Sequence, residues 1–195
     1  MIYVTATKTD DACEDDILRR FPSSREYVSE ILSRANNESK RQSLSGLSAL
    51  LFLLDYVGEK TEALVLKRQK GGKPYFENSD WQFGISHSGD VAVCGLSKNA
   101  VGIDVEQLKP RKNVLAFAKR FFSEGEYVIM QKSANPEFEF YNIWTKKEAR
   151  LKSIGKGVDT DLTKIDTTKQ EFTTLRAYDC VINVCGASVK FIGGK

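Results

Sequence analysis

Residues 83–106 read FGISHSGDVAVCGLSKNAVGIDVE. A Ser-Gly-Asp turn at residues 88–90 separates two apolar segments, Phe83–Ser86 and Val91–Leu96, and this pattern predicts a pair of strands. A second turn, at Lys98 and Asn99, precedes another strand-like segment over Val101–Glu106. Strands joined only by short turns predict a sheet in the middle of the chain.

Helices and further strands are expected on both sides of this sheet. Ile2–Ala6 is strand-like, whereas Arg41–Tyr56 has leucines at helical spacing and Gly58 just past its end. More helices are predicted over Val114–Phe121, from Ser123 with Glu126 in a capping box, and from Asn135 and Pro136 to a point before Gly155. The remaining strand-like segments are Leu162–Ile165, Glu171–Ala177, Cys180–Val184 and Ser188–Ile192. This mixture predicts an α+β fold, with the Lys98-Asn99 turn dividing the chain into half-domains of residues 1–98 and 99–195.

The composition is that of an ordered globular protein. Of the 195 residues, 41% are hydrophobic and 28% are charged, which excludes a disordered chain and a simple coiled coil. The net charge of +3 is too small to indicate nucleic-acid binding, although it is compatible with an acidic protein partner. The first residues do not resemble a signal peptide, and the apolar run Leu47–Leu54 is too short to span a membrane. We therefore expect a cytoplasmic protein without a membrane or nucleic-acid partner.

The four cysteines do not form a metal-binding or disulfide pattern. They lie at Cys13, Cys94, Cys180 and Cys185, with no Cys-x-x-Cys pair, and His87 is the one histidine. This excludes a zinc-ligand cluster, and reduced, buried thiols are expected.

Two carboxylates follow each other on the strand of residues 101–106. Asp104 and Glu106 are two residues apart, so in a strand they share one face, opposite Ile103 and Val105. Two like charges this close raise each other's pKa unless a cation lies between them, and Mg²⁺ prefers carboxylate oxygens. The pair thus predicts either a magnesium site on a central strand or the solvated face of an edge strand.

The predicted helix from Pro136 places charged residues in line with apolar ones. Trp144, Lys147, Glu148, Leu151 and Lys152 have the spacing of a single stripe. A carboxylate beside two lysines is what a metal–pyrophosphate site requires. The alternative is an exposed Glu148–Lys152 pair with no role in binding.

The segment that contains His87 is a third candidate. Gly84 and Ser86 begin a nucleophile-elbow pattern, but Ser88 stands where its last glycine is required. His87 is better suited to contact a phosphate or to pack as a core histidine. Gly71-Gly72-Lys73-Pro74 is a turn without a phosphate-loop or dinucleotide pattern, and Gly155-Lys156-Gly157 is typical of a helix stop.

Taken in order, these motifs resemble the 4'-phosphopantetheinyl transferase superfamily, and specifically its surfactin-type (Sfp-type) branch. The resemblance covers residues 72–157. The matching motifs are Gly72-Lys73-Pro74-Tyr75, Phe83–Ser88, Val101–Glu106, Phe121-Phe122-Ser123 with Glu126-Tyr127, and Trp144-x-x-Lys147-Glu148-Ala149-x-x-Lys152-x-x-Gly155-Lys156-Gly157. Gly84 departs from the asparagine of many members, and Gly125 is expected to loosen the turn that holds Glu126.

The resemblance implies a pseudo-twofold monomer of two similar α/β halves with the active site in the cleft between them. The implied reaction transfers the 4'-phosphopantetheine arm of coenzyme A to a serine of an apo acyl or peptidyl carrier protein and releases 3',5'-adenosine bisphosphate. Mg²⁺, or Mn²⁺ in its place, would be the metal.

The resemblance also implies a role for each matching residue. Asp104, Glu106 and Glu148 would bind the metal, and Lys152 would contact the pyrophosphate. Ser86 and His87 would contact a phosphate of coenzyme A, with Lys73 and Pro74 on the adenine side. Arg41 resembles the family's contact to the 3'-phosphate.

The attacking serine must lose a proton, and a positioned base contributes about 10²–10⁴-fold to such a step. Glu126 and Lys147 are the candidates, while Glu126 is also the expected capping-box glutamate. A water relay is a third route.

Two other classes of function compete with the transferase. One is a non-catalytic module that binds coenzyme A or a carrier protein, although every candidate ligand is present. The other is a serine hydrolase built on Ser86. The residues that select a carrier are expected in the Gln107–Val114 segment and before Pro136, and the carrier's pathway stays open.

Overall fold

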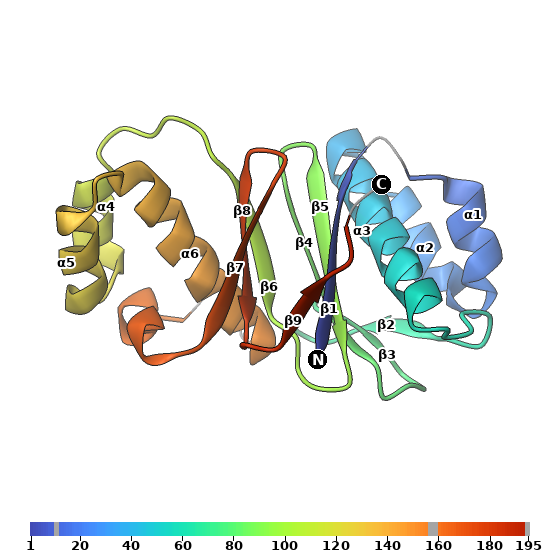
Figure 1. The fold of residues 1–195 in the computed structure, drawn as a ribbon. Coiled ribbons are helices and arrows are strands. Elements are labelled where there is room, and N and C mark those ends of the chain that lie inside the picture. Colours follow the sequence, from blue (N-terminus) through green and yellow to red (C-terminus); the bar gives the residue numbers. More distant parts are fainter. Residues whose placement is uncertain (10–11, 156–159, 194–195) are drawn as a thin grey trace.

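The computed structural model describes residues 1–9, 12–155 and 160–193. It confirms the α+β fold, with two sheets in the middle and helices on both outer sides (Figure 1). The strands are β1 (Ile2–Lys8), β2 (Leu66–Arg68), β3 (Pro74–Phe76), β4 (Gln82–Ser88), β5 (Val91–Ser97), β6 (Ile103–Gln107), β7 (Phe172–Ala177), β8 (Cys180–Cys185) and β9 (Val189–Phe191). The helices are α1 (Glu14–Arg20), α2 (Arg25–Leu32), α3 (Asn37–Tyr56), α4 (Val114–Phe121), α5 (Glu124–Lys132) and α6 (Pro136–Ser153), with 3₁₀ turns η1 (Pro22–Ser24), η2 (Leu162–Lys164) and η3 (Thr167–Lys169).

The two large sheets are built from different sets of strands. The first has the strand order β4-β5-β1-β9, in which β9 from the end of the chain runs parallel to β1. The second is antiparallel with the order β6-β8-β7, and β2 and β3 form a separate hairpin. Strands β4 and β6 are thus edge strands of their own sheets.

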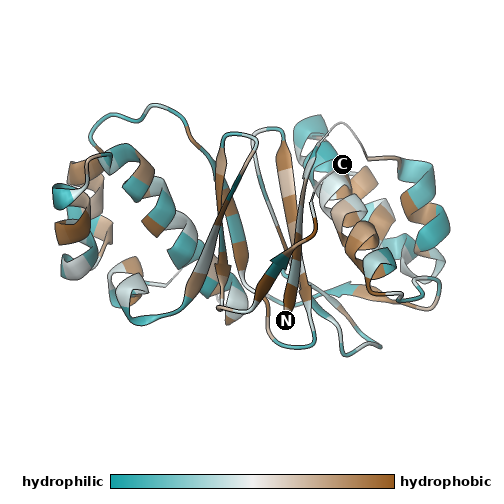
Figure 2. Ribbon diagram, in the orientation of Figure 1, coloured by the Kyte–Doolittle hydropathy of each residue, from teal (hydrophilic) through white to brown (hydrophobic). Residues whose placement is uncertain are grey.

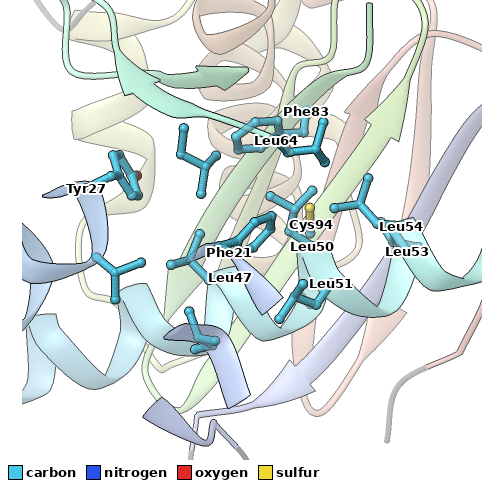
Figure 3. Close-up of a cluster of buried hydrophobic side chains, with 14 of the residues drawn as sticks. Phe21, Tyr27, Leu47, Leu50, Leu51, Leu53, Leu54, Leu64, Phe83 and Cys94 are labelled. Carbon is cyan, nitrogen blue, oxygen red and sulfur yellow. The ribbon is translucent and has the colours of Figure 1, made fainter. Parts of the chain in front are cut away.

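Three apolar clusters hold the layers together. One lies between α1–α3 and the first sheet, where Phe21 and the α3 leucines surround Phe83 and Cys94 (Figure 3). A second lies between the two sheets and contains valines and isoleucines of β1, β5, β6 and β8. The third packs α4–α6 together. Apolar residues accordingly concentrate along the strands, and hydrophilic ones on the outer turns of the helices (Figure 2).

Most predicted elements are present. Helix α3 begins earlier than predicted, because the Asn36 side chain accepts a hydrogen bond from the Ser39 backbone N–H and caps it. Both bonds of the Ser123–Glu126 capping box are formed, with Gly125 between these two residues. Helix α6 begins at Pro136 after the Asn135 cap, as predicted.

Other expectations are wrong. Leu162–Lys164 forms the 3₁₀ turn η2 rather than a strand, because the Asp161 side chain accepts from the Thr163 N–H and Lys147 binds the carbonyls of Leu162 and Ile165. Helices α1 and α2 and the β2–β3 hairpin were not predicted.

The cysteines and the carboxylate strand also need correction. All four thiols are free, but Cys13 is exposed and Cys185 is half-buried. Strand β6 begins at Ile103 and is an edge strand rather than a central one. In the described part of the chain, no helix combines the length and apolarity that crossing a membrane requires.

Gly102 lets the start of β6 lie directly against α6. A Cβ atom at this position would lie 2.0 Å from the Ala149 carbonyl oxygen and 2.8 Å from the Ser153 nitrogen. Both are backbone atoms of a helix, so they cannot rotate away. The close approach fixes the distance between β6 and α6.

Gly102→Ala is therefore expected to lower the free energy of unfolding by about 1–3 kcal/mol, measured by urea denaturation. Gly125→Ala is the matched control, because that glycine is helical and its added methyl would meet no atom within 4 Å. It should raise stability by about 0.5–1 kcal/mol. Equal stabilities of Gly102→Ala and the wild type would contradict the β6–α6 contact.

Candidate functional site

Serines of β4 and carboxylates of β6 meet where the edges of the two sheets adjoin. Ser86 Oγ donates to Asp104 Oδ1 at 2.7 Å, and Ser88 Oγ donates to Glu106 Oε2 at 2.9 Å. Alternate residues of a strand share a face, so the two serines on β4 lie opposite the two carboxylates on β6. The predicted common face of Asp104 and Glu106 is therefore directed at β4 and is not a solvated edge.

Asp104 is a buried carboxylate with two different oxygen atoms. Lys152 Nζ lies 2.6 Å from Oδ1 and donates also to Ser86 Oγ at 2.8 Å. Oδ2 is buried and accepts no hydrogen bond. Only 5% of Asp104 is exposed, and its Oδ2 atom has almost no accessible surface. Oδ1 carries both polar contacts, whereas Oδ2 has none among the described residues.

The remaining carboxylates of the predicted set lie within electrostatic reach of Asp104. Burial raises the pKa of Glu106, and the charge of Asp104 raises it further. Burial also raises the pKa of Glu148, and the charges of Asp104 and then Glu106 raise it further. Lys152 lowers both pKa values in part. The cluster carries more negative charge than this lysine balances.

These residues fit a hard divalent cation in chemistry and charge. The fit rests on the unpartnered Asp104 Oδ2 and on carboxylates whose mutual repulsion a cation would relieve. Over residues 1–9, 12–155 and 160–193, no three His, Cys, Asp or Glu side chains are already gathered around one metal position. The magnesium assignment to Asp104, Glu106 and Glu148 therefore stays a prediction.

Helix α6 divides its charged residues between two sides. Lys152 lies 2.6 Å from Asp104 Oδ1, and Trp144 lowers the pKa of Glu106 by a small amount. Lys147 instead is buried on the side of η2. The predicted single stripe is therefore split, and Lys152 pairs with Asp104 rather than forming an exposed pair with Glu148.

A cavity of about 300 Å³ lies beside the carboxylates. It is lined by Gly71, Gly72, Lys73, Pro74, Gly84, Ile85, Glu148, Leu151, Lys152 and Gly155. The Lys73 ammonium donates to the carbonyls of Val101 at 2.9 Å and Lys152 at 2.8 Å. Burial, and then the charge of Lys152, lowers the pKa of Lys73. Lys73 thus joins the glycine turn to the end of α6.

A second cavity, of about 190 Å³, shares Pro74 and Ile85 with the first. Three basic side chains line it, those of Arg34, Arg68 and His87. The sharing of two wall residues means that the basic cavity adjoins the carboxylate cavity. Together they offer cationic and anionic groups side by side.

The basic groups of this second cavity are held in different ways. Arg34 donates to Ser43 Oγ at 2.6 Å, and Arg68 lies 4.7 Å from the centre of the Tyr27 ring. The His87 side chain is exposed, yet partial burial lowers its pKa, followed by the charge of Lys152. The lowered pKa favours the neutral imidazole of His87, which can donate or accept a hydrogen bond.

The predicted Arg41 is not part of either cavity. It is exposed on α3, near the turn after β4. There, the hydrogen bond from Lys8 lowers the pKa of Asp90, with a smaller contribution from Arg41. Sequence reasoning missed Arg34 and Arg68, because single arginines in a helix linker and a short strand belong to no motif.

Glu126 and Lys147 form a separate, fully buried ion pair. Lys147 Nζ lies 2.7 Å from Glu126 Oε2, and neither side chain has exposed surface. Glu126 also accepts from the Ser123 N–H and from both the N–H and hydroxyl of Thr167. Lys147 donates to the carbonyls of Leu162 and Ile165. The pair fastens residues 162–167 to α5 and α6 and does not touch the described cavities.

The Gly155-Lys156-Gly157 motif lies only partly within the described residues. Gly155 follows the end of α6 and has a φ of 65°, a conformation that favours glycine. Lys156 and Gly157 lie outside the described residues.

Replacing Lys147 by methionine is expected to lower the free energy of unfolding by about 3–5 kcal/mol. The reason is that Glu126 would lose its cation while still buried. Urea denaturation followed by tryptophan fluorescence measures this. Lys164→Met is the control, because that side chain is 80% exposed and its loss should cost less than about 1 kcal/mol. Similar losses in the two variants would contradict the buried pair.

Glu148 predicts a pH dependence of stability. Its folded-state pKa is raised by burial and by Asp104, so between the ordinary and the raised pKa the folded protein binds more protons than the unfolded chain. Stability from this group therefore falls as pH rises through that window. In thermal melts with EDTA, Glu148→Gln should be more stable than wild type at neutral pH, and the difference should shrink at acidic pH. The exposed Glu62→Gln should follow the wild-type curve; a Glu148→Gln variant that does the same would refute the prediction.

Comparison with known proteins agrees with the motifs. Residues 100–186 match the family model described as the 4'-phosphopantetheinyl transferase superfamily. The chain is 34% identical over 123 residues to 4'-phosphopantetheinyl transferase gsp of Aneurinibacillus migulanus, which covers 62% of this chain and 51% of that protein. It is 39% identical over 97 residues to 4'-phosphopantetheinyl transferase Sfp of Bacillus subtilis, covering 48% of this chain and 42% of Sfp.

A third relative is matched over more of its length. 4'-phosphopantetheinyl transferase HetI of a Nostoc strain is 32% identical over 142 residues, covering 67% of this chain and 60% of HetI. The matched stretches thus span about half the length of these relatives. These findings confirm the resemblance of the chain to the 4'-phosphopantetheinyl transferase superfamily and to relatives in its surfactin-type branch.

Proposed function

We propose that the protein transfers the 4'-phosphopantetheine group of coenzyme A to a serine hydroxyl of an apo acyl or peptidyl carrier protein and releases 3',5'-adenosine bisphosphate. The observation that carries this proposal is the junction of two cavities, one with Glu148 and Lys152 and the other with Arg34, Arg68 and His87. A substrate with a pyrophosphate and a separate phosphate needs cationic groups at two neighbouring places. The proposal is a holo-acyl-carrier-protein synthase activity.

The basic groups have separate tasks in this proposal. Lys152, at the carboxylate cluster, neutralises the pyrophosphate and stabilises the charge that develops on the departing phosphate. Arg34, Arg68 and His87 bind the phosphate that is distant from the reaction, in place of the predicted Arg41. Pro74 and the stem of Lys73 form the wall on the adenine side, since both line the larger cavity.

Asp104, Glu106 and Glu148 would hold Mg²⁺, or Mn²⁺. When bound, such an ion polarises the pyrophosphate and offsets its charge. The unpartnered Asp104 Oδ2 supports this assignment, because it is the carboxylate oxygen that neither Ser86 nor Lys152 engages. Ser86 keeps its hydroxyl on Asp104 rather than on a phosphate.

The predicted bases receive a different role. Glu126 and Lys147 have no exposed surface in this conformation, and each is saturated with partners. We propose that they support the reaction by holding residues 162–167 in place, and that neither touches the attacking serine.

The larger organisation is part of the same proposal. Residues 1–98 and 99–195 would be the two halves of a pseudo-twofold, cytoplasmic monomer, with substrates bound between them. A third cavity, of about 370 Å³, contains Lys109, Pro110, Asn135 and Arg176, and so includes both segments expected to select the carrier. Its basic residues suit an acidic carrier helix.

The mass of an intact apo carrier protein tests the function. After incubation with this protein, coenzyme A and Mg²⁺, the carrier should gain one phosphopantetheine, and the gain should vanish with EDTA. No gain with several carriers, despite binding of coenzyme A, would favour the non-catalytic binding module. No binding of coenzyme A would refute the proposal.

Asp104→Asn tests the site within this assay. The transfer rate should fall by about 10²-fold or more, because the variant loses a charged ligand of the proposed metal. Circular dichroism should remain that of the wild type, and coenzyme A should still bind. Near-normal transfer by the folded variant would remove Asp104 from the site.

A further inference from the structure

Ser88 belongs to the Phe83–Ser88 motif but has no role in the proposed function, and it lies two residues after Ser86 on the same strand. We propose that Ser86 and Ser88 are positioning residues that aim the carboxylates of Asp104 and Glu106, each holding one oxygen and leaving the other for a divalent cation. The inference rests on the proposed function, because it concerns the cation of that site.

The geometry repeats along the two edge strands. Ser86 and Ser88 are two residues apart on β4, and Asp104 and Glu106 are two residues apart on β6. The hydroxyl–carboxylate distances are 2.7 and 2.9 Å. Since the strands belong to different sheets, these side-chain bonds join the sheets where no backbone ladder does. A slip of either strand by one residue would break both bonds.

The direction of each hydroxyl is fixed by a second partner. Ser88 Oγ accepts a hydrogen bond from the Gln107 N–H at 3.1 Å, which leaves its own proton for Glu106 Oε2. Ser86 Oγ accepts from Lys152 and donates to Asp104 Oδ1. Neither serine can turn away without losing two hydrogen bonds.

The result for Asp104 is an asymmetric carboxylate. Oδ1 accepts hydrogen bonds from Ser86 and Lys152, while Oδ2 is buried and accepts none. Glu106 is held by Ser88 at Oε2. Groups that orient metal ligands in this way typically change metal affinity by about 10–100-fold when they are removed.

Binding of Mn²⁺, followed by calorimetry and electron paramagnetic resonance, tests the proposal directly. Ser88→Ala should weaken Mn²⁺ binding by about 10-fold, and Ser88→Thr, which keeps the hydroxyl, should restore most of it. In the transfer assay, Ser88→Ala should need more metal for half-maximal rate, with the KM for coenzyme A unchanged at saturating metal. Ser86→Ala should behave alike.

Ser97→Ala is the matched control. Ser97 is a buried serine of the neighbouring strand β5, and its Oγ accepts from the Asn99 N–H and contacts no carboxylate. Its Mn²⁺ affinity should equal that of the wild type. If Ser97→Ala and Ser88→Ala lose the same affinity, the effect is a general weakening of the sheet and the inference is overturned.

The outcomes separate this inference from the proposed function. Transfer by the wild type with unchanged Mn²⁺ affinity in Ser88→Ala overturns the inference alone. Mn²⁺ binding that depends on Ser88, in a protein that modifies no carrier, supports the inference and removes the function. A wild type that binds no Mn²⁺ overturns the inference.

Discussion

The burial of the Asp104 charge is the constraint on which the arrangement around the site depends. A carboxylate with 5% exposure must be compensated, and the chain does so at Oδ1 from two elements, with Ser86 on β4 and Lys152 on α6, while the buried Oδ2 accepts no hydrogen bond from the described residues. These contacts require the two sheets and α6 to meet at one place. Gly102 allows α6 to come close enough, and Lys73 fastens the turn before β3 to the same helix end. The contacts that compensate the Asp104 charge therefore depend on the same packing that brings the two sheets and α6 together.

Helix α6 contributes Lys147 to a second buried charged group, the ion pair with Glu126. Lys147 and Glu126 are removed from water completely. Lys147 donates to two carbonyls of the 162–167 segment, and Glu126 accepts from Thr167 and from the Ser123 N–H. Such a pair adds little net stability compared with apolar residues, but it binds this segment to α5 and α6. We interpret the neighbouring Lys147 and Glu148 as two residues of one motif with opposite surroundings, one sealed in the interior and the other lining a cavity.

Much of the fold and part of the site could be predicted from the sequence. Alternation on β6 placed Asp104 and Glu106 on one face, and the caps at Ser123 and Asn135 located two helices, because these signals are local. Burial is not local. Whether Lys147 faces a cleft or the interior depends on residues 162–167, which are distant in sequence, and η2 owes its form to that same lysine. Arg34 and Arg68 could not be placed either, since only the folded chain brings them beside His87.

The pairing of β9 with β1 has a consequence for how the chain reaches this structure. Ile2 lies opposite Val189, so one edge of β1 is completed only by residues that are made much later. During synthesis β1 can pair with β5 on one side, while its other edge keeps unpaired N–H and C=O groups. Contacts of such long sequence separation form slowly, because a large loop must close first. The edge of β1 that β9 covers therefore stays open to association with other chains until residues 189–191 have been made and have paired with it.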